Sequence, residues 1–390
     1  FYIVNGCSLT SGADRKCRRM INSIYKKNPE TKVIITGCYA QSHPYLDSIN
    51  QSKSLIVPQY LKEFIPEIAT NQFRANRFSP LLLKDYLKER MQMRINAFAG
   101  RSRAFVKIQD GCSDYCAYCI IPFMRGNPKS KKAEIIIKEI SGLVKAGFQE
   151  VVLTGINLGV WAEDLSGELS LSSLIRQIEK IKGLKRLRLS SIGVQHINKE
   201  LIQVIADSGK LCKHLHISLQ SGDDFILNKM QRKYSVSKYL GKIEQIKKAV
   251  ENISFTTDII VGFPGESNEH FKNTLKAVKI VGFLKVHIFP FSPREKTQAY
   301  CLPEKVALKT IEMRKQQLKD TAMQVSLLFR KSLLNKTVQV LFEQQEQDYS
   351  IGYSDNYVPV KVYGCKNLEN KLLSIKVIRV TINHTFGRLL

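Results

Sequence analysis

"AFVKIQDGCSDYCAYCIIPFMRG", residues 104–126, joins a short apolar run to three closely spaced cysteines. The alternation of its first six residues predicts a β-strand, and the glycine that follows predicts a turn. Cys112, Cys116 and Cys119 then lie within eight residues. Three thiolates on one loop can ligate three irons of a 4Fe-4S cluster and leave the fourth iron open for a substrate or cosubstrate. Two other interpretations are a zinc site completed by a distant Cys or His, and buried cysteines without a ligand role.

The strand pattern of residues 104–109 recurs along the middle of the chain. Each further apolar, β-rich run is separated from the next by a segment with helical periodicity. These runs lie at 150–155, 184–191, 214–220, 255–263 and 285–291. Alternating strands and amphipathic helices predict an α/β fold, here a partial (β/α)6 barrel. The cysteine loop follows the first strand, so we expect it at the carboxyl ends of the strands, where such barrels carry their chemistry.

The regions around this barrel predict further domains. An N-terminal α/β domain is expected over 1–78, where a strand, a basic helix and a second buried strand follow one another. Residues 79–100 are basic and weakly periodic, as is typical of a linker. The barrel with its final Lys-rich helix is expected over 101–332. Residues 333–390 alternate like the strands of a small β-barrel.

Composition narrows the class of partner. The 390 residues include 60 Lys and Arg against 34 Asp and Glu, a formal charge of +26. Such an excess favours a polyanionic partner, nucleic acid first, although solvated helix faces are the alternative. No apolar run approaches the about 18 residues of a membrane span, and no secretory leader is recognisable. We therefore expect a cytoplasmic protein whose nine cysteines do not form a disulfide scaffold.

The spacing Cys-x3-Cys-x2-Cys, with Tyr118 before the last cysteine, resembles the radical S-adenosylmethionine superfamily. Six further motifs resemble the bacterial tRNA methylthiotransferases, and among them most closely the branch acting on threonylcarbamoyl-adenosine. These motifs are "NGCSLTSGADRKCRR" (5–19), "VIITGCYAQ" (33–41), "LTGINLG" (153–159), "HLHISLQSG" (214–222), "TTDIIVGFPGE" (256–266) and "HIFPFSPR" (287–294). The resemblance covers nearly the whole chain, including a tail similar to the TRAM RNA-binding domain.

The resemblance implies two 4Fe-4S clusters and S-adenosylmethionine as cofactors. Cys112, Cys116 and Cys119 would hold the radical-generating cluster, and Cys7 and Cys38 match two of the three ligands of an auxiliary cluster. The first auxiliary cysteine of the family would lie upstream of Phe1, so either this chain is a fragment or the auxiliary cluster is lost. The implied reaction adds a methylthio group to the C2 carbon of the modified adenosine next to the anticodon, an unactivated C–H that needs a radical. The implied partners are tRNA, an electron donor such as flavodoxin or ferredoxin, and a sulfur donor.

Further candidate residues fall into two groups. The cosubstrate is expected to meet Tyr118, Gly155, Asn157, Gln220, Asp258 and Gly262. For these residues, a role in closing a turn or satisfying backbone groups is the alternative. The tRNA is expected to meet Arg125, Lys131, Lys132, Lys361 and Arg379. Basic side chains of this kind position the phosphate backbone and do not select a base.

Four positions depart from the family pattern: Gly193 replaces an acidic residue, Ser218 replaces Pro, Lys296 replaces Gly, and Gln298 replaces Pro. These departures, together with the unmatched auxiliary cysteine, leave a catalytically impaired RNA-binding homologue as one alternative function. Action on isopentenyl-adenosine is the other. "GCYAQ" and "GIN" in this chain favour the threonylcarbamoyl branch over it.

Overall fold

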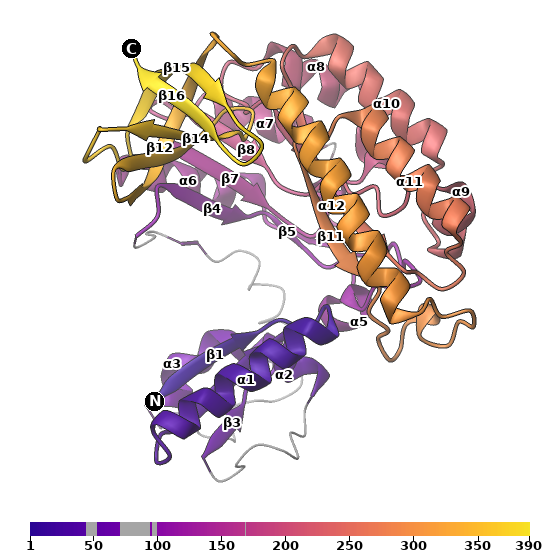
Figure 1. Ribbon diagram of the computed structural model, residues 1–390. Coiled ribbons are helices and arrows are strands. Elements are labelled where there is room, and N and C mark those ends of the chain that lie inside the picture. The colour runs from indigo at the N-terminus through magenta and orange to yellow at the C-terminus, as the bar shows by residue number, and fades with distance from the viewer. Residues whose placement is uncertain (44–52, 71–93, 96–99, 168) are drawn as a thin grey trace. The chain divides into compact units, whose positions relative to one another are not determined.

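The computed structural model describes residues 1–43, 53–70, 94–95, 100–167 and 169–390 (Figure 1). The linker predicted over 79–100 lies largely outside these residues. The chain forms two compact units, which are described separately. Within the described residues, the first unit is drawn from 1–90, 111–127 and 292–302, and the second from 91–110, 128–291 and 303–390. The cysteine loop therefore belongs to the same unit as the N-terminal sheet.

The first unit contains a three-stranded parallel sheet in the order β1-β2-β3. Its elements are β1 (Tyr2–Gly6), α1 (Ser11–Lys27), β2 (Val33–Gly37), α2 (Cys38–Ser42), β3 (Ser54–Ile56), η1 (Gln59–Phe64), α3 (Ile65–Ala69), α5 (Ile121–Arg125) and η6 (Gln298–Tyr300). The Thr10 hydroxyl accepts a hydrogen bond from the Ala13 N–H and so caps α1. Ile21 of α1 and Ile35 of β2 are fully buried in the core of this sheet.

The second unit contains six parallel strands in two sheets. One has the order β4-β7-β8 and the other β11-β10-β9. The strands are β4 (Arg103–Lys107), β7 (Glu150–Thr154), β8 (Arg186–Leu189), β9 (His214–His216), β10 (Ser254–Val261) and β11 (Lys285–Pro290). Single bridges, among them Ser191 with His216, connect β8 to the β9 side. An α/β fold with six strands at the predicted places is thus confirmed.

One predicted strand, 214–220, is longer than the structure allows, because β9 ends at His216. Beyond it, the Leu219 N–H donates to the Thr257 hydroxyl instead of a backbone carbonyl. Gln220 then takes a left-handed conformation with φ of 65°. A side chain replaces the ladder partner at this point, so the regular strand stops three residues after it begins.

Helices cover the barrel strands, and α12 lies beside β11 and α11 (Figure 1). The helices are α6 (Ala133–Lys145), α7 (Leu171–Glu179), α8 (Lys199–Asp207), α9 (Asp224–Lys229), α10 (Val236–Ala249), α11 (Asn268–Val281) and α12 (Leu308–Lys331). Short elements join them: β5 (Gln109–Asp110), β6 (Lys129–Ser130), η4 (Leu158–Val160) and η5 (Val194–His196). Ser170, Asn198 and Ser235 cap the starts of α7, α8 and α10 through their side-chain oxygens.

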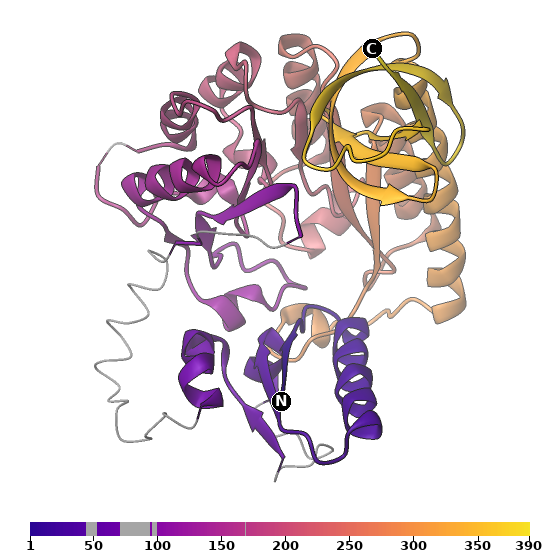
Figure 2. The same cartoon turned by 90° about the vertical axis from the view of Figure 1, so that its left-hand side faces the viewer.

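The C-terminal strands close into a small barrel in the order β12-β13-β14-β16-β15, which Figure 2 shows as a ring. Its strands are β12 (Thr337–Glu346), β13 (Tyr349–Ser354), β14 (Pro359–Tyr363), β15 (Leu372–Val380) and β16 (Thr385–Leu389). Val340, Phe342 and Val360 are fully buried in its core. The alternating pattern of the tail therefore gives the closed sheet that the sequence predicts.

Buried charges attach this small barrel to β7 and β8. Glu150 accepts from Arg188 Nε at 2.7 Å and from Arg186 at 3.4 Å, and all three side chains are nearly inaccessible. Arg188 also donates to the backbone oxygens of Ser354 and Asp355. Burial opposes ionisation of Glu150, but the two guanidinium groups outweigh it and lower the pKa of that carboxyl.

No helix in the described part of the chain is both long and apolar enough to cross a membrane.

We expect Glu150→Gln to lower the free energy of unfolding by about 3 kcal/mol, because it leaves two buried guanidinium groups without their anion. Urea denaturation at neutral pH measures this loss. The folded pKa of Glu150 is lowered, so its contribution is present above the ordinary value of 4.5 and is lost as the pH falls through the folded pKa. The wild-type chain should therefore show a steeper acid dependence than the variant.

Glu200→Gln provides the control, since Glu200 is exposed in the first turn of α8. Its loss should cost less than about 1 kcal/mol. Equal destabilisation by both substitutions would contradict a special role for the buried carboxylate.

Candidate functional site

The cysteine loop is closed at its base by backbone contacts. The Cys112 N–H donates to the Gly126 oxygen at 3.0 Å, and the Cys119 N–H donates to the Cys116 oxygen at 2.9 Å. Gly111 has φ of 78°, and a Cβ there would lie 2.2 Å from the Asn127 oxygen, so only glycine fits where the loop begins. The local structure therefore holds the three cysteines on one tight turn.

The donor chemistry of this loop fits an iron-sulfur cluster. Cys116 is buried, while Cys112 and Cys119 are partly buried. Burial raises the pKa of the Cys112 thiol to about 11, so a bound cation is needed to keep it as a thiolate. Among the described residues, no three His, Cys, Asp or Glu side chains converge on one metal position.

Cys7 and Cys38 lie at one edge of the N-terminal sheet. Gly6 of β1 pairs in parallel with Gly37 of β2, and each cysteine follows its glycine directly. Gly37 has φ of 88°, and a Cβ there would lie 2.5 Å from Asn5 Oδ1 and from the Gly6 oxygen. This close approach of the two strand ends places both cysteines at one edge of the sheet; their expected role as ligands of one cluster stays a prediction.

A buried ion pair orders the turn that carries Cys7. Arg294 donates to Asp14 at 2.8 Å and also to the Ser8 backbone oxygen, which follows Cys7 in the chain. The Ser8 hydroxyl donates to the other oxygen of Asp14 at 2.7 Å. Arg294 is the last residue of the motif "HIFPFSPR" (287–294). The structure shows it bonded to the N-terminal turn.

Cys17 packs in the core of the same sheet. Its sulfur would lie 2.7 Å from a Cβ at Gly6. Burial, and then the charge of Asp14, raises the pKa of the Cys17 thiol to about 11. A protonated, enclosed thiol suits a packing role for this cysteine.

Arg125 contacts Cys38 directly, at the edge of the N-terminal sheet. Its Nε donates to Cys38 Sγ at 3.3 Å, and it is the last residue of α5, which follows the cysteine loop. The sequence had grouped Arg125 with the RNA-binding residues. No sequence signal pairs two residues 87 positions apart, so this contact could be found only in the structure.

In the second unit, Gly155 and Asn157 follow β7. Gln109 Oε1 accepts from the Ile156 N–H at 2.9 Å and from the Asn157 N–H at 3.1 Å. The Asn157 side-chain oxygen accepts in turn from the Gly159 and Gly193 N–H groups. Asn157 is therefore used to join two turns at the carboxyl ends of β7 and β8. Its expected contact with the cosubstrate stays a prediction.

Asp258 of β10 is hydrogen-bonded to polar side chains at the end of β9 and just after it. Its Oδ2 meets His216 Nε2 at 3.1 Å and accepts from the Ser218 hydroxyl at 2.9 Å. Burial opposes ionisation, but these two partners outweigh it and lower the pKa of Asp258. Ser218, which departs from the family pattern, thus gives the carboxylate a donor that proline could not supply.

Gly262 is held by a glutamate that the sequence analysis quoted but did not assign. The Gly262 N–H donates to Glu266 Oε2 at 2.8 Å, and the same oxygen accepts from Arg314 at 2.7 Å. Arg314 and Glu266 are both buried. An ion pair from α12 therefore fixes the glycine turn that follows β10.

The expected RNA-binding residues differ in accessibility, and one is corrected. Lys131 is 3% exposed, and its ammonium lies 2.6 Å from the buried Glu139 carboxylate, so it is not available to a phosphate. Lys132 is exposed. Lys361 lies 3.3 Å from Glu346, and Arg379 is exposed with its guanidinium over the Phe386 ring.

The tyrosines of the C-terminal barrel differ in exposure, which the sequence alone does not reveal. Tyr357 stacks on His214, and Tyr353 stacks on Tyr357, so these two rings pack against the larger barrel. Tyr363 is 68% exposed and contacts Tyr349 edge-on. Tyr363, which the sequence analysis did not single out, is therefore the better candidate for stacking on a base.

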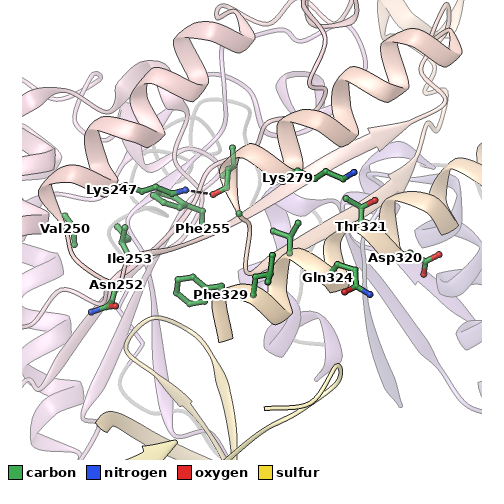
Figure 3. A pocket seen from close by; sticks show the side chains of 14 residues that line it. Lys247, Val250, Asn252, Ile253, Phe255, Lys279, Asp320, Thr321, Gln324 and Phe329 are labelled. Atoms are coloured by element: carbon green, nitrogen blue, oxygen red, sulfur yellow. Dashed lines mark hydrogen bonds between the residues drawn. The ribbon is translucent and has the colours of Figure 1, made fainter. Parts of the chain in front are cut away.

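A cavity of about 800 Å³ lies among the ends of α10 and α11 and the side of α12 (Figure 3). Phe255 and Phe329 line it, and Lys247 donates to the Val281 oxygen beside it at 2.6 Å. Phe255 is near the start of β10, so the cavity lies by the amino ends of the strands, away from the edge where β/α barrels carry their chemistry. It is not the candidate active site.

Comparisons with known proteins match parts of this chain to two families. Residues 106–278 match the Radical SAM superfamily, and residues 1–57 match Uncharacterized protein family UPF0004. A threonylcarbamoyladenosine tRNA methylthiotransferase of Chlamydia pneumoniae is 36% identical over 99% of this chain and 88% of its own length. One of Bacillus subtilis is 32% identical over 99% of this chain and 87% of its own length.

A tRNA-2-methylthio-N(6)-dimethylallyladenosine synthase of Lachnoclostridium phytofermentans is also 32% identical, over 97% of this chain and 84% of its own length. Among solved structures, the radical S-adenosylmethionine methyltransferase TsrM of Kitasatospora setae, with cobalamin and a 4Fe-4S cluster bound, has a TM-score of 0.53. That match is 12% identical, covers 77% of this chain and 65% of that one, and supports the fold alone. With relatives at this identity along almost its whole length, the chain belongs to the radical S-adenosylmethionine tRNA methylthiotransferases.

Proposed function

We propose that this chain adds a methylthio group to the C2 carbon of N6-threonylcarbamoyladenosine next to the anticodon of tRNA. The observation that carries the proposal is the 36% identity to a relative named for that substrate over 99% of the chain. Relatives named for dimethylallyladenosine reach 32%. The sequence "GCYAQ" around Cys38 supports the same branch.

Membership of this family gives 4Fe-4S clusters and S-adenosylmethionine as cofactors. Cys112, Cys116 and Cys119 would ligate the radical-generating cluster, and Cys7 and Cys38 the auxiliary one. When bound, the first cluster supplies the electron that cleaves the cosubstrate to a radical, and the second supplies the sulfur.

The residues of the chain position these groups. The Gly126 oxygen and the Cys112 N–H close the radical-cluster loop, and the Gly6–Gly37 pair brings the auxiliary thiols to one edge. Gly155, Gln220 and Gly262, which follow β7, β9 and β10, would lie at the cosubstrate.

The small C-terminal barrel would bind tRNA as a TRAM-like domain. Exposed Tyr363 and Arg379 combine a base-stacking surface with a cation, as single-stranded nucleic acid requires. An electron donor such as flavodoxin or ferredoxin and a sulfur donor would complete the reaction.

Deletion of the gene should remove the methylthio mark from threonylcarbamoyladenosine, as measured by mass spectrometry of tRNA nucleosides. Complementation with Cys116→Ala should not restore the mark, because the substitution removes one of the three expected ligands of the radical cluster. The matched control is Cys301→Ala, which changes an exposed cysteine and should restore it. Loss of the mark from dimethylallyladenosine instead would select the alternative substrate.

Anaerobic reconstitution should load about eight irons per chain, corresponding to two cubane clusters. The triple substitution of Cys112, Cys116 and Cys119 by Ala should leave about four, and Cys7→Ala with Cys38→Ala should also leave about four. Iron and sulfide analysis measures both. A chain that retains no iron would support the catalytically impaired RNA-binding alternative.

Arg379→Gln should weaken tRNA binding and reduce the slope of log Kd against log salt by about 1, because one phosphate contact is lost. Fluorescence anisotropy over a salt series measures this. Lys309→Gln, an exposed charge on α12, is the matched control. An equal effect of the two substitutions would argue for diffuse charge instead of a binding face on the small barrel.

A further inference from the structure

Arg125 makes its contact with Cys38 inside one compact unit, at a site shielded from water. Its Nε lies 3.3 Å from Cys38 Sγ, and Cys38 is 6% exposed. α2, which begins at Cys38, packs against α5, which ends at Arg125. The guanidinium has only N–H donors, so in this contact it donates to the cysteine sulfur. Because the guanidinium stays charged at any pH that the protein meets, the hydrogen bond is always charge-assisted.

We infer that Arg125 is a positioning residue of the auxiliary cluster: it holds the Cys38 sulfur by a charge-assisted hydrogen bond and raises the reduction potential of the cluster bound there. The inference rests on the proposed function in one respect, because it takes Cys38 as a cluster ligand.

The effect on the potential follows from charge. Reduction adds one electron to the cluster, and a cation bonded to a ligand sulfur stabilises the more negative state. Hydrogen bonds to the sulfurs and the net charge around a cluster are among the main determinants of its potential. Because water is largely excluded at Cys38, the interaction is stronger than at an exposed site.

The backbone around Arg125 is fixed by the radical-cluster loop. The Gly126 N–H donates to the Pro122 oxygen at 3.0 Å and ends α5, and the Gly126 oxygen accepts from the Cys112 N–H. The residue that follows Arg125 is therefore bonded to the first ligand of the radical cluster. One short segment thus links the ligands of one cluster to a ligand of the other.

This role differs from the phosphate contact expected from the sequence. A phosphate contact needs an accessible guanidinium, whereas Arg125 is partly buried and its Nε is already directed at sulfur. The two roles also predict different measurements: a sulfur contact changes the cluster, and a phosphate contact changes the salt dependence of tRNA binding.

The test uses the full chain with Cys112, Cys116 and Cys119 replaced by Ala, reconstituted with iron and sulfide so that the auxiliary cluster alone is present. Arg125→Gln and Arg125→Lys are introduced into this background. Lys129→Gln serves as control, because it removes one exposed charge four residues away. A redox titration followed by electron paramagnetic resonance gives the midpoint potential, and tRNA binding over a salt series is measured in the chain with all cysteines intact.

We expect Arg125→Gln to shift the midpoint potential to a more negative value, Arg125→Lys to shift it less, and Lys129→Gln to leave it unchanged. The tRNA affinity of Arg125→Gln should stay within about twofold of the wild type. Loss of iron from Arg125→Gln, with iron and a shifted potential in Arg125→Lys, also supports the inference.

An unchanged potential in Arg125→Gln overturns it, whether or not the salt slope of tRNA binding falls. An altered far-UV circular dichroism spectrum of the iron-free Arg125→Lys chain overturns it too, because the residue would then hold the fold instead of the sulfur. Adding Cys38→Ala to the background separates this from the proposed function: iron retained there would remove Cys38 from the ligand set whatever Arg125 does.

Discussion

The parallel pairing of Gly6 with Gly37 places Cys7 and Cys38 at one edge of the N-terminal sheet. Parallel strands end on the same side of a sheet, so the residues that follow neighbouring strands lie close together whatever their identity. The same constraint acts in the barrel, where Gly155 follows β7 and Gly262 follows β10. In both units, strand direction therefore places the candidate ligands at one edge of a sheet. Side-chain contacts then fix the turns on which these residues lie.

Ion pairs supply several of the contacts that fix these turns. Glu266 bonds the Gly262 turn and Arg314 together, and Asp14 bonds the Ser8 turn to Arg294. Each pair replaces the water that its charges lose on burial, and each holds a turn next to a candidate ligand. Removal of one partner would leave the other charge without compensation, so the turns depend on both members.

Because of such buried pairs, only part of the net charge of +26 is available to a polyanionic partner. Lys131, Arg188 and Arg314 are buried with carboxylates, and so they stabilise the fold and do not attract a polyanion at close range. The exposed cations, such as Lys132 and Arg379, are the ones that can meet tRNA. Composition counts all of them equally because it carries no information on burial.

Local periodicity and spacing, which depend on neighbouring residues only, were enough to predict the six parallel strands, the β-barrel of the tail and the three-cysteine loop. The sequence pattern overextended β9, because the Leu219 to Thr257 hydrogen bond that ends the ladder joins residues 38 apart. Tertiary structure alone decided that Lys131 is buried, that Tyr353 and Tyr357 pack at an interface, and that Arg125 meets Cys38. Each of these outcomes depends on which distant segments fold against one another, and a local pattern does not contain that information.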